Sequence, residues 1–196
     1  MSVNNGTILI TGCAGFIGAA LTKKFLGQSY KVIGIDNIND YYDTNLKISR
    51  LNNIDTFAKD RKCFWEFLKL SICDKNAISK VFQEKKPNIV VNLAAQAGVR
   101  FSIKNPEVYL ESNINGFFNI LENCRVNKVE HLVYASSSSV YGSNNEYPFT
   151  ENQNVSQPLS FYAATKISNE MMAFSYSNIY KMSITGLRFF TVFGPW

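Results

Sequence analysis

Tyr162 and Lys166 have the residue types and the spacing of a proton-transfer pair. Residues four apart share one face of a helix, so the two side chains would lie side by side. A phenol has a pKa of about 10 and is a poor base at neutral pH, but a neighbouring ammonium group favours the phenolate. A serine from the run Ser136–Ser139 would hold a substrate hydroxyl against that phenolate. Together they would remove a hydroxyl proton while a nicotinamide accepts the hydride.

Simpler interpretations of the same residues exist. Four serines can form the polar end of a strand, and Lys166 could pair with Glu170 one helical turn further on. A tyrosine followed four residues later by a lysine also occurs often by chance. The chemical interpretation is favoured because the pair follows a serine-ended strand in a sequence with the features of a dinucleotide-binding fold.

Three glycines near the N-terminus carry those features. The strand-forming run Thr7–Ile10 leads into Gly12, Gly15 and Gly18, and an apolar helical pattern follows over residues 19–26. Gly12 would permit a tight turn, Gly15 would let the backbone approach a pyrophosphate at the helix N-terminus, and Gly18 would let the helix lie close to the strand. An ordinary strand-to-helix turn is the alternative.

Asp36 supports the dinucleotide interpretation. It ends the second predicted strand, residues 31–35, and lies 18 residues after Gly18. A carboxylate about 20 residues past the glycines typically binds the adenosine ribose hydroxyls. No arginine follows Asp36 closely, so the sequence favours NAD over NADP.

The remaining elements alternate between strand and helix. Apolar patterns predict further strands over residues 64–70, 89–93, 131–135 and 183–190, and helices over residues 44–52, 75–85, 106–126 and 162–180. This alternation predicts an α/β fold, a doubly wound parallel sheet of about six strands with helices on both faces. In such a sheet the motifs meet at the carboxyl ends of the first, fourth, fifth and sixth strands. We expect one Rossmann-like domain over residues 1–196.

Composition excludes several other classes of protein. The chain has 196 residues, 46% of them hydrophobic, and a net charge of +5, but its lysines are scattered and form no basic stripe for nucleic acid. Four cysteines without metal-ligand spacing and one histidine predict no metal site and reduced thiols. No signal peptide or membrane-spanning segment is apparent, so we expect a cytoplasmic protein without a membrane partner.

Several longer runs carry a family resemblance. The runs Asn92–Arg100, Tyr134–Gly142 and Gly186–Trp196, together with the glycines and the Tyr162–Lys166 pair, resemble the extended short-chain dehydrogenase/reductases. Within them the chain resembles the NAD-dependent epimerase/dehydratase family, most closely bacterial UDP-glucuronate 4-epimerases. The resemblance covers essentially the whole chain. The family continues past the position of Trp196 into a substrate-binding domain, so we expect a chain truncated before that domain.

The resemblance also implies roles for individual residues. The catalytic residues would be Ser137, Tyr162 and Lys166. The cofactor-binding residues would be Gly12, Gly15, Phe16, Ile17, Gly18, Asp36, Asn37, Ser71, Ile72, Leu93, Ala94, Ala95, Ser112, Tyr162 and Lys166. The substrate-binding residues would be Arg100, Ser137, Ser138, Ser139, Phe190 and Thr191. Ser71 stands where relatives usually carry an aspartate near the adenine, which would weaken that contact.

The implied activity is NAD-dependent 4-epimerisation of a UDP-sugar, of the UDP-glucuronate/UDP-galacturonate type, through a transient 4-keto intermediate. Related dehydratases place an Asp-Glu pair after the strand-five serine or threonine, whereas this chain has Ser138 and Ser139 and so lacks the acid that elimination needs. The alternatives are a catalytically silent NAD-binding fragment and a dehydratase or reductase of the same family. The family further implies a homodimer formed through the two long helices.

Overall fold

The computed structural model describes residues 6–196, which fold around one six-stranded sheet. The strands run in the order β3-β2-β1-β4-β5-β6, and every neighbouring pair is parallel. The order reverses at β1, so a crevice is expected beyond the carboxyl ends of β1 and β4. The strands are β1 (Thr7–Thr11), β2 (Lys31–Asp36), β3 (Trp65–Lys69), β4 (Ile89–Asn92), β5 (His131–Ser137) and β6 (Ile184–Phe189).

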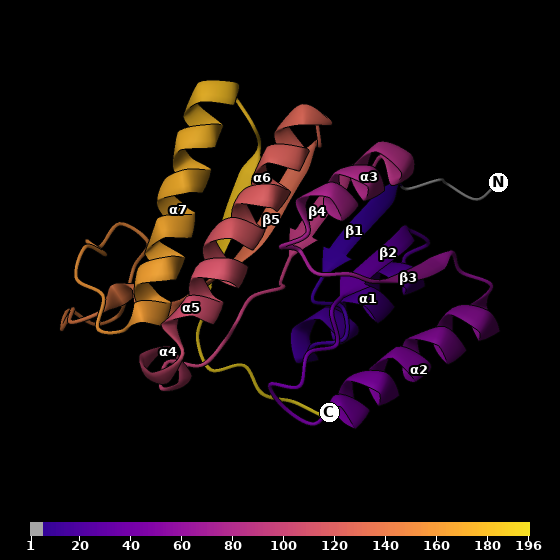
Figure 1. The fold of residues 1–196 in the computed structure, drawn as a ribbon, viewed down its shortest axis with the longest axis horizontal. Helices are drawn as coiled ribbons and strands as arrows, with labels where there is room; N and C mark the ends of the chain where they lie inside the picture. The colour runs from indigo at the N-terminus through magenta and orange to yellow at the C-terminus, as the bar shows by residue number, and fades with distance from the viewer. Residues whose placement is uncertain (1–5) are drawn as a thin grey trace.

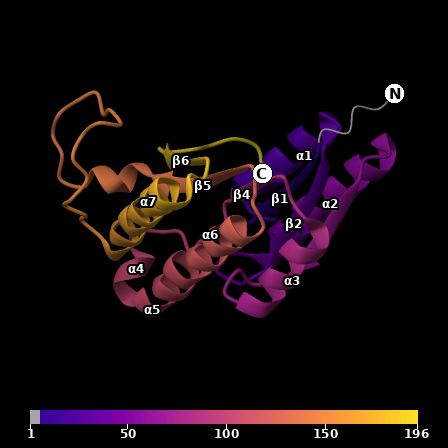
Figure 2. The ribbon, with the colours of Figure 1, turned by 90° about the horizontal axis from the view of Figure 1, so that it is seen from above.

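Helices cover both faces of the sheet, which confirms the predicted doubly wound architecture (Figure 1). Seen from above, α1 and α2 lie on one side of the strands, and α3, α6 and α7 lie on the other (Figure 2). The helices are α1 (Phe16–Gly27), α2 (Thr44–Arg61), α3 (Lys75–Lys85), α4 (Phe101–Lys104), α5 (Pro106–Tyr109), α6 (Phe117–Val126) and α7 (Phe161–Tyr180). A π-helical segment, η1 (Leu110–Gly116), joins α5 to α6, and a 3₁₀ turn, η2 (Ser138–Tyr141), follows β5.

The strands are apolar without interruption because both of their faces are buried. Successive side chains of a strand point to opposite faces, and in β1 Ile8 and Ile10 pack with α1 and α2 while Leu9 packs with α3, α6 and α7. All three side chains are fully buried. Two-sided burial of this kind is what the run of apolar residues in a central parallel strand indicates.

The structure corrects the predicted end of α2. The helix was expected to stop at residue 52, but it continues to Arg61 and ends where Lys62 adopts a left-handed conformation with φ of 54°. Ile54 and Ala58 are buried against the α1 side of the core and hold the extra turns in place. Leu51, Ile54 and Ala58 have helical spacing, so the apolar periodicity continues past the predicted end of the helix.

The long helix predicted over residues 106–126 is present but not regular. Its middle, Leu110–Gly116, is a π-helical segment, and such segments occur often at functional sites. Gly116 is buried, and an added Cβ would lie 2.7 Å from the side chain of Ile72. The helix therefore approaches the end of β3 more closely than a larger residue would allow.

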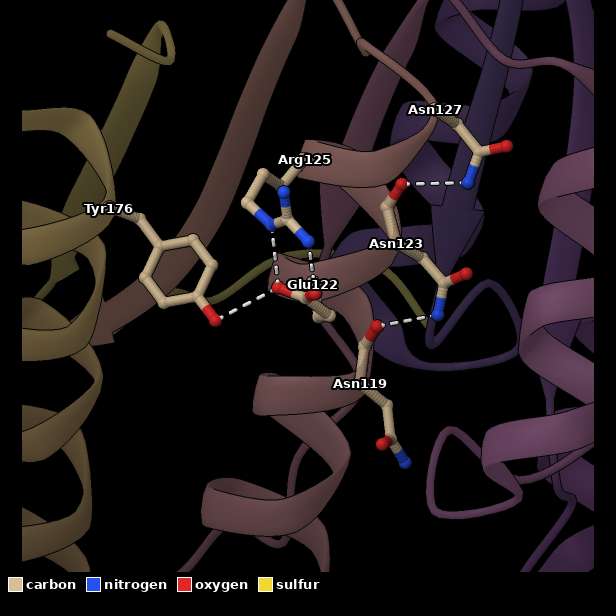
Figure 3. A network of polar contacts seen from close by, with 6 residues as sticks. All are labelled: Asn119, Glu122, Asn123, Arg125, Asn127 and Tyr176. Atoms are coloured by element: carbon tan, nitrogen blue, oxygen red, sulfur yellow. Dashed lines mark hydrogen bonds and ion pairs between the residues drawn. The ribbon is translucent and has the colours of Figure 1, made fainter. Parts of the chain in front are cut away.

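Polar contacts fix α6 against α7, the helix that carries Tyr162 and Lys166 (Figure 3). The hydroxyl of Tyr176 on α7 donates to Glu122 Oε2 on α6 at 3.0 Å, and Arg125 holds the same carboxylate from the next turn at 2.6 Å. On another side of α6, Asn123 and Asn127 each donate to the carbonyl four residues earlier, at 2.8 and 2.9 Å. Of these contacts, the one between Tyr176 and Glu122 joins α7 to α6, and the others lie within α6 and the residue that follows it.

Two features are absent from the part of the chain that the structure describes. None of its helices combines the length and the apolar character needed to cross a bilayer. Within residues 6–196, no three side chains of histidine, cysteine, aspartate or glutamate gather as metal ligands would.

Candidate active site

The glycine turn after β1 is built by close backbone packing. Gly12 has a φ of 72°, and its N–H donates to the Ile35 carbonyl at 2.7 Å. A Cβ on Gly12 would lie 2.8 Å from the Ala94 nitrogen, and a Cβ on Gly18 would lie 2.8 Å from the Gly12 carbonyl carbon. A side chain at either position would therefore collide with backbone atoms of the turn or of the loop after β4. The turn is followed directly by the N-terminus of α1, which attracts negative charge.

Asp36 ends β2 beside this turn. Its carboxylate is buried, and each oxygen accepts one backbone N–H: Oδ2 from Ala14 at 3.1 Å and Oδ1 from Ile38 at 2.9 Å. Since a carboxylate oxygen can accept more than one hydrogen bond, both oxygens keep acceptor capacity for a ligand hydroxyl. The two backbone contacts fix where that capacity lies.

The ends of β1 and β4 are joined by a side-chain contact. The Thr11 hydroxyl donates to Asn92 Oδ1 at 2.6 Å and accepts from the Ala94 N–H at 3.1 Å. This contact holds the small residues after β4 next to the glycine turn. Ala94 and Ala95 are only partly buried, so a flat group can pack against them.

Tyr162, Lys166 and Ser137 meet where β5 ends against the start of α7. Ser160 caps α7, its hydroxyl accepting the Ala163 N–H at 3.0 Å, so Tyr162 lies in the first helical turn. The Lys166 ammonium donates to the Ala135 carbonyl at 2.9 Å and lies 5.9 Å from the centre of the Tyr162 ring. The Ser137 hydroxyl accepts the Ser139 N–H at 3.1 Å.

Burial dominates the electrostatics of these groups. It raises the pKa of Tyr162, and a hydrogen bond with the Ser137 hydroxyl acts in the opposite direction. Burial also lowers the pKa of Lys166 to about 8. A low-dielectric site disfavours the charged form of both groups, so in the chain by itself Tyr162 is protonated at neutral pH.

The suggested pairing of Lys166 with Glu170 is wrong. Glu170 instead accepts a bidentate contact from Arg188 on β6, at 3.0 and 2.8 Å, and the Ser136 hydroxyl at 2.5 Å. The Arg188 and Glu170 side chains are only 18% and 12% exposed. This buried cluster joins β5, α7 and β6 next to Ser137. Lys166 takes no part in it and lines the cavity instead.

One cavity of about 700 Å³ collects most of the predicted site residues. It opens at the carboxyl ends of the strands, between the glycine turn and the start of α7. Its lining includes Gly12, Gly15, Phe16, Ile17, Gly18, Asp36, Asn37, Ser71, Ile72, Leu93, Ala94, Ala95, Ser112, Ser137, Tyr162, Lys166 and Phe190. Among residues 6–196, four predicted substrate contacts are not part of that lining: Arg100, Ser138, Ser139 and Thr191.

Sequence reasoning missed a buried amide in this region. Asn113, in the π-helical segment η1, accepts the Gln96 N–H at 2.7 Å and donates to the Gln96 carbonyl at 3.1 Å. Its own carbonyl accepts from Asn169 of α7 at 2.6 Å. Asn113 therefore fixes the loop after β4 against α7. In the sequence, Asn113 could have been noticed only as a polar residue among the apolar positions of the helix predicted over residues 106–126.

Tyr109 was missed as well. It is fully buried, packs edge-on against the Tyr162 ring at 6.1 Å, and donates to the carbonyl of Ala97 at 2.7 Å. Burial raises its pKa to about 12, so it stays a hydrogen-bond donor at neutral pH. Nothing in the sequence distinguished this tyrosine from an ordinary core aromatic residue. Lys47 and Arg50, which also line the cavity, were missed because the helix that carries them was predicted only by its apolar residues.

Comparison with known proteins adds three findings. The profile of the NAD dependent epimerase/dehydratase family matches residues 8–196. Protein CapI of Staphylococcus aureus is 54% identical over 96% of this chain and 55% of its own length, and UDP-glucuronate 4-epimerase 4 of Arabidopsis thaliana is 46% identical over 100% and 44%. The UDP-glucuronic acid 4-epimerase of Bacillus cereus, in complex with UDP-glucuronic acid and NAD, has a TM-score of 0.86 at 34% identity, covering 96% of this chain and 58% of that one. The chain spans about half the length of the curated relatives it matches.

Proposed function

Because the chain belongs to the NAD-dependent epimerase/dehydratase family, we propose that it carries the NAD site and the catalytic residues of a UDP-glucuronate 4-epimerase. The observation that carries this proposal is the meeting of Ser137, Tyr162 and Lys166 at the cavity that the glycine turn and Asp36 also line. The similarity to UDP-glucuronate 4-epimerases supports UDP-glucuronate as the substrate. The geometry of the cavity supports the reaction type.

The cavity fits a dinucleotide. Gly12 and Gly18 leave a backbone cradle that a Cβ would fill, and the N-terminus of α1 opens into it. Asp36 has fixed acceptor positions for the adenosine ribose hydroxyls, and Ala94 and Ala95 offer a flat wall. A carboxylate at this position would repel a 2′-phosphate, which favours NAD over NADP. When bound, oxidised NAD accepts a hydride and returns it, and its positive charge favours the Tyr162 phenolate.

The chain's own residues then have distinct tasks. Tyr162 takes the proton of the sugar hydroxyl and gives it back after the sugar has turned over. Ser137 is set to donate toward the phenol oxygen because its own oxygen already accepts the Ser139 N–H. The ammonium of Lys166 is held by the Ala135 carbonyl of β5. Lys166 lies on the same face of α7 as Tyr162, and its positive charge favours the phenolate.

The same region supports epimerisation over elimination. Elimination needs an acid near the departing hydroxyl, and Ser138 and Ser139 cannot supply one. Glu170 is close to Ser136, but both of its oxygens are engaged by Arg188 and one also by the Ser136 hydroxyl. With both oxygens held by Arg188 and Ser136, Glu170 is not placed to protonate a departing hydroxyl.

The exposed apolar residues of the two long helices support a homodimer. Leu110 and Phe118 on η1 and α6, and Met171 and Phe174 on α7, are all exposed. Apolar groups gathered on neighbouring helices are typical of a surface that pairs with another subunit. Light scattering of the purified chain measures this directly.

The proposal is tested by following UDP-glucuronate with NAD present. Since the relatives are about twice as long, the assay uses the chain alone and the chain joined after Trp196 to the corresponding remainder of CapI. A 4-epimerase produces UDP-galacturonate without accumulating NADH, because the hydride is returned in each turnover. Accumulating NADH would indicate a dehydrogenase, loss of water a dehydratase, and NAD binding without turnover in the joined protein a silent cofactor-binding module. Each of these results would overturn the proposal.

A further inference from the structure

Arg50 of α2 is a buried cation next to the glycine turn. It is only 5% exposed. One guanidinium nitrogen, Nη1, donates to the Ala14 carbonyl at 3.3 Å, and the guanidinium carbon lies 5.9 Å from the ring of Phe16. Ala14 belongs to the turn and Phe16 is the first residue of α1, so the charge of Arg50 lies at the N-terminal end of that helix.

The hydrogen-bond partners of this guanidinium include no aspartate or glutamate side chain. Besides Ala14, Nη1 donates to the Tyr42 hydroxyl at 2.9 Å and Nη2 donates to the Trp196 carbonyl, while Nε is buried without a partner. No aspartate or glutamate side chain within residues 6–196 forms an ion pair with Arg50. Asp36 is turned to the backbone N–H groups of Ala14 and Ile38. A buried guanidinium without a carboxylate side chain as its partner favours a bound anion.

The other cation of α2 that lines the cavity is already used. Lys47, one turn before Arg50, donates to the carbonyl and the side-chain oxygen of Asn39 at 2.9 and 2.5 Å and lies 4.8 Å from the Tyr42 ring centre. It therefore holds the loop between β2 and α2 closed over that side of the cavity. Of the two cations of α2 that line the cavity, Arg50 is the one without a side-chain partner on its Nε.

We propose that Arg50 binds a phosphate oxygen of the cofactor's diphosphate. This rests on the proposed dinucleotide site and names a residue that the glycine motif does not contain. Arg50 lines the same cavity as Gly15 and Phe16, and α1 has no acidic residue in its first turn and no side-chain cap at Gly15. The free N–H groups of the helix and the guanidinium thus face one anion from two sides.

A diphosphate, rather than a 2′-phosphate, is the phosphate that we expect Arg50 to bind. A 2′-phosphate would lie on the adenosine ribose, beside the carboxylate of Asp36. Arg50 contacts Ala14 of the turn, whose N–H also binds Asp36, and lies near Phe16, the first residue of α1. A role of Arg50 at the diphosphate is compatible with a preference for NAD.

Binding of NAD, ADP, 2′-AMP and adenosine to the wild-type chain and to Arg50→Gln tests the inference. A charge-assisted contact to phosphate predicts that Arg50→Gln binds ADP about tenfold to a hundredfold more weakly, with adenosine affected by less than about twofold. The control is Arg61→Gln on the same helix, because Arg61 is exposed and stacks on Phe57 at 4.8 Å, away from the cavity. This variant should bind every ligand as the wild type does.

The outcomes separate the two claims. A wild-type chain that binds neither NAD nor ADP overturns the proposed function. A wild type that binds ADP with Arg50→Gln within about threefold of it overturns only the role of Arg50, as does a loss confined to 2′-AMP. Melting temperatures without ligand report whether each variant folds. If Arg50→Gln does not fold, Arg50→Lys carries the test: it keeps the charge without the planar fork, and we expect ADP binding several-fold weaker than wild type.

Discussion

Replacing Gly12 and Gly15 with alanine separates the two tasks of the glycine turn. Gly12 has a φ of 72°, in the region that residues with a Cβ avoid, and its Cβ would lie 2.8 Å from the Ala94 nitrogen and 2.9 Å from the Leu93 carbonyl carbon. Both neighbours are backbone atoms at the end of β4 and cannot rotate away. Gly15 has a φ of −73° and a ψ of 170°, which alanine adopts freely, and its Cβ would meet only the Gly12 carbonyl oxygen, at 3.1 Å.

The expected magnitudes differ accordingly. For Gly12→Ala, a left-handed backbone conformation costs about 1–2 kcal/mol and overpacking about 1–3 kcal/mol, so the free energy of unfolding should fall by about 2–5 kcal/mol. For a chain of this length that corresponds to a melting temperature lower by roughly 4–20 °C. Gly15→Ala should change stability by less than about 1 kcal/mol, yet weaken NAD binding, because a methyl group there meets the approaching diphosphate.

Urea denaturation gives the two stabilities, and calorimetric titration with NAD gives the two affinities. The reasoning is refuted if Gly12→Ala is as stable as the wild type. It is also refuted if Gly15→Ala loses as much stability as Gly12→Ala, since the structure leaves room for a methyl group at only one of the two positions.

Three further predictions concern charged groups of the site. NAD should bind at least about tenfold more tightly than NADP, and Asp36→Ala should weaken NAD binding by about 1.5–3 kcal/mol in a calorimetric titration; equal affinities for the two cofactors would contradict the role of Asp36. The folded-state pKa of Lys166 is lowered to about 8 from 10.5, so the unfolded state binds more protons between these values and the contribution of Lys166 to stability rises with pH. Wild type should therefore gain stability relative to Lys166→Met between about pH 8 and pH 10, and a constant difference in urea melts would count against the shift. Glu170→Gln should destabilise the chain by about 3–5 kcal/mol because it strands the buried Arg188, and adding Arg188→Met should recover much of that loss; an additive double variant would show that the pair is not coupled.

The sequence predicted the sheet and the glycine turn well because both are determined locally. Uninterrupted apolar runs identify buried parallel strands, and all six were found within two residues of their observed bounds. The helix α3 was predicted at its observed bounds, Lys75–Lys85, because Asp74 caps it and Pro87 follows it. Gly12 and Gly18 could be predicted because a Cβ at either position would collide with backbone atoms.

The contacts that determine the chemistry of the site were harder to predict because they join distant parts of the chain. The pairing of Lys166 with Glu170 looked plausible from spacing, but Arg188, on a strand 18 residues later, takes the carboxylate. Arg50 and Asn113 lie on helices that were predicted from the spacing of their apolar residues, and this spacing says nothing about the polar residues between them. What makes each of them notable exists only in the folded chain: a buried Nε without a partner in Arg50, and in Asn113 a backbone carbonyl that accepts a hydrogen bond from α7.

The central claim is that Tyr162 is the base of a UDP-sugar 4-epimerase, and turnover by Tyr162→Phe tests it most directly. The measurement uses the chain joined to the remainder of CapI, with UDP-glucuronate as substrate and NAD affinity determined on the same preparation. The substitution removes only the phenol oxygen, so the account predicts a loss of about 10²–10⁴-fold in turnover with NAD still bound. Turnover equal to wild type, with cofactor bound, would contradict the account.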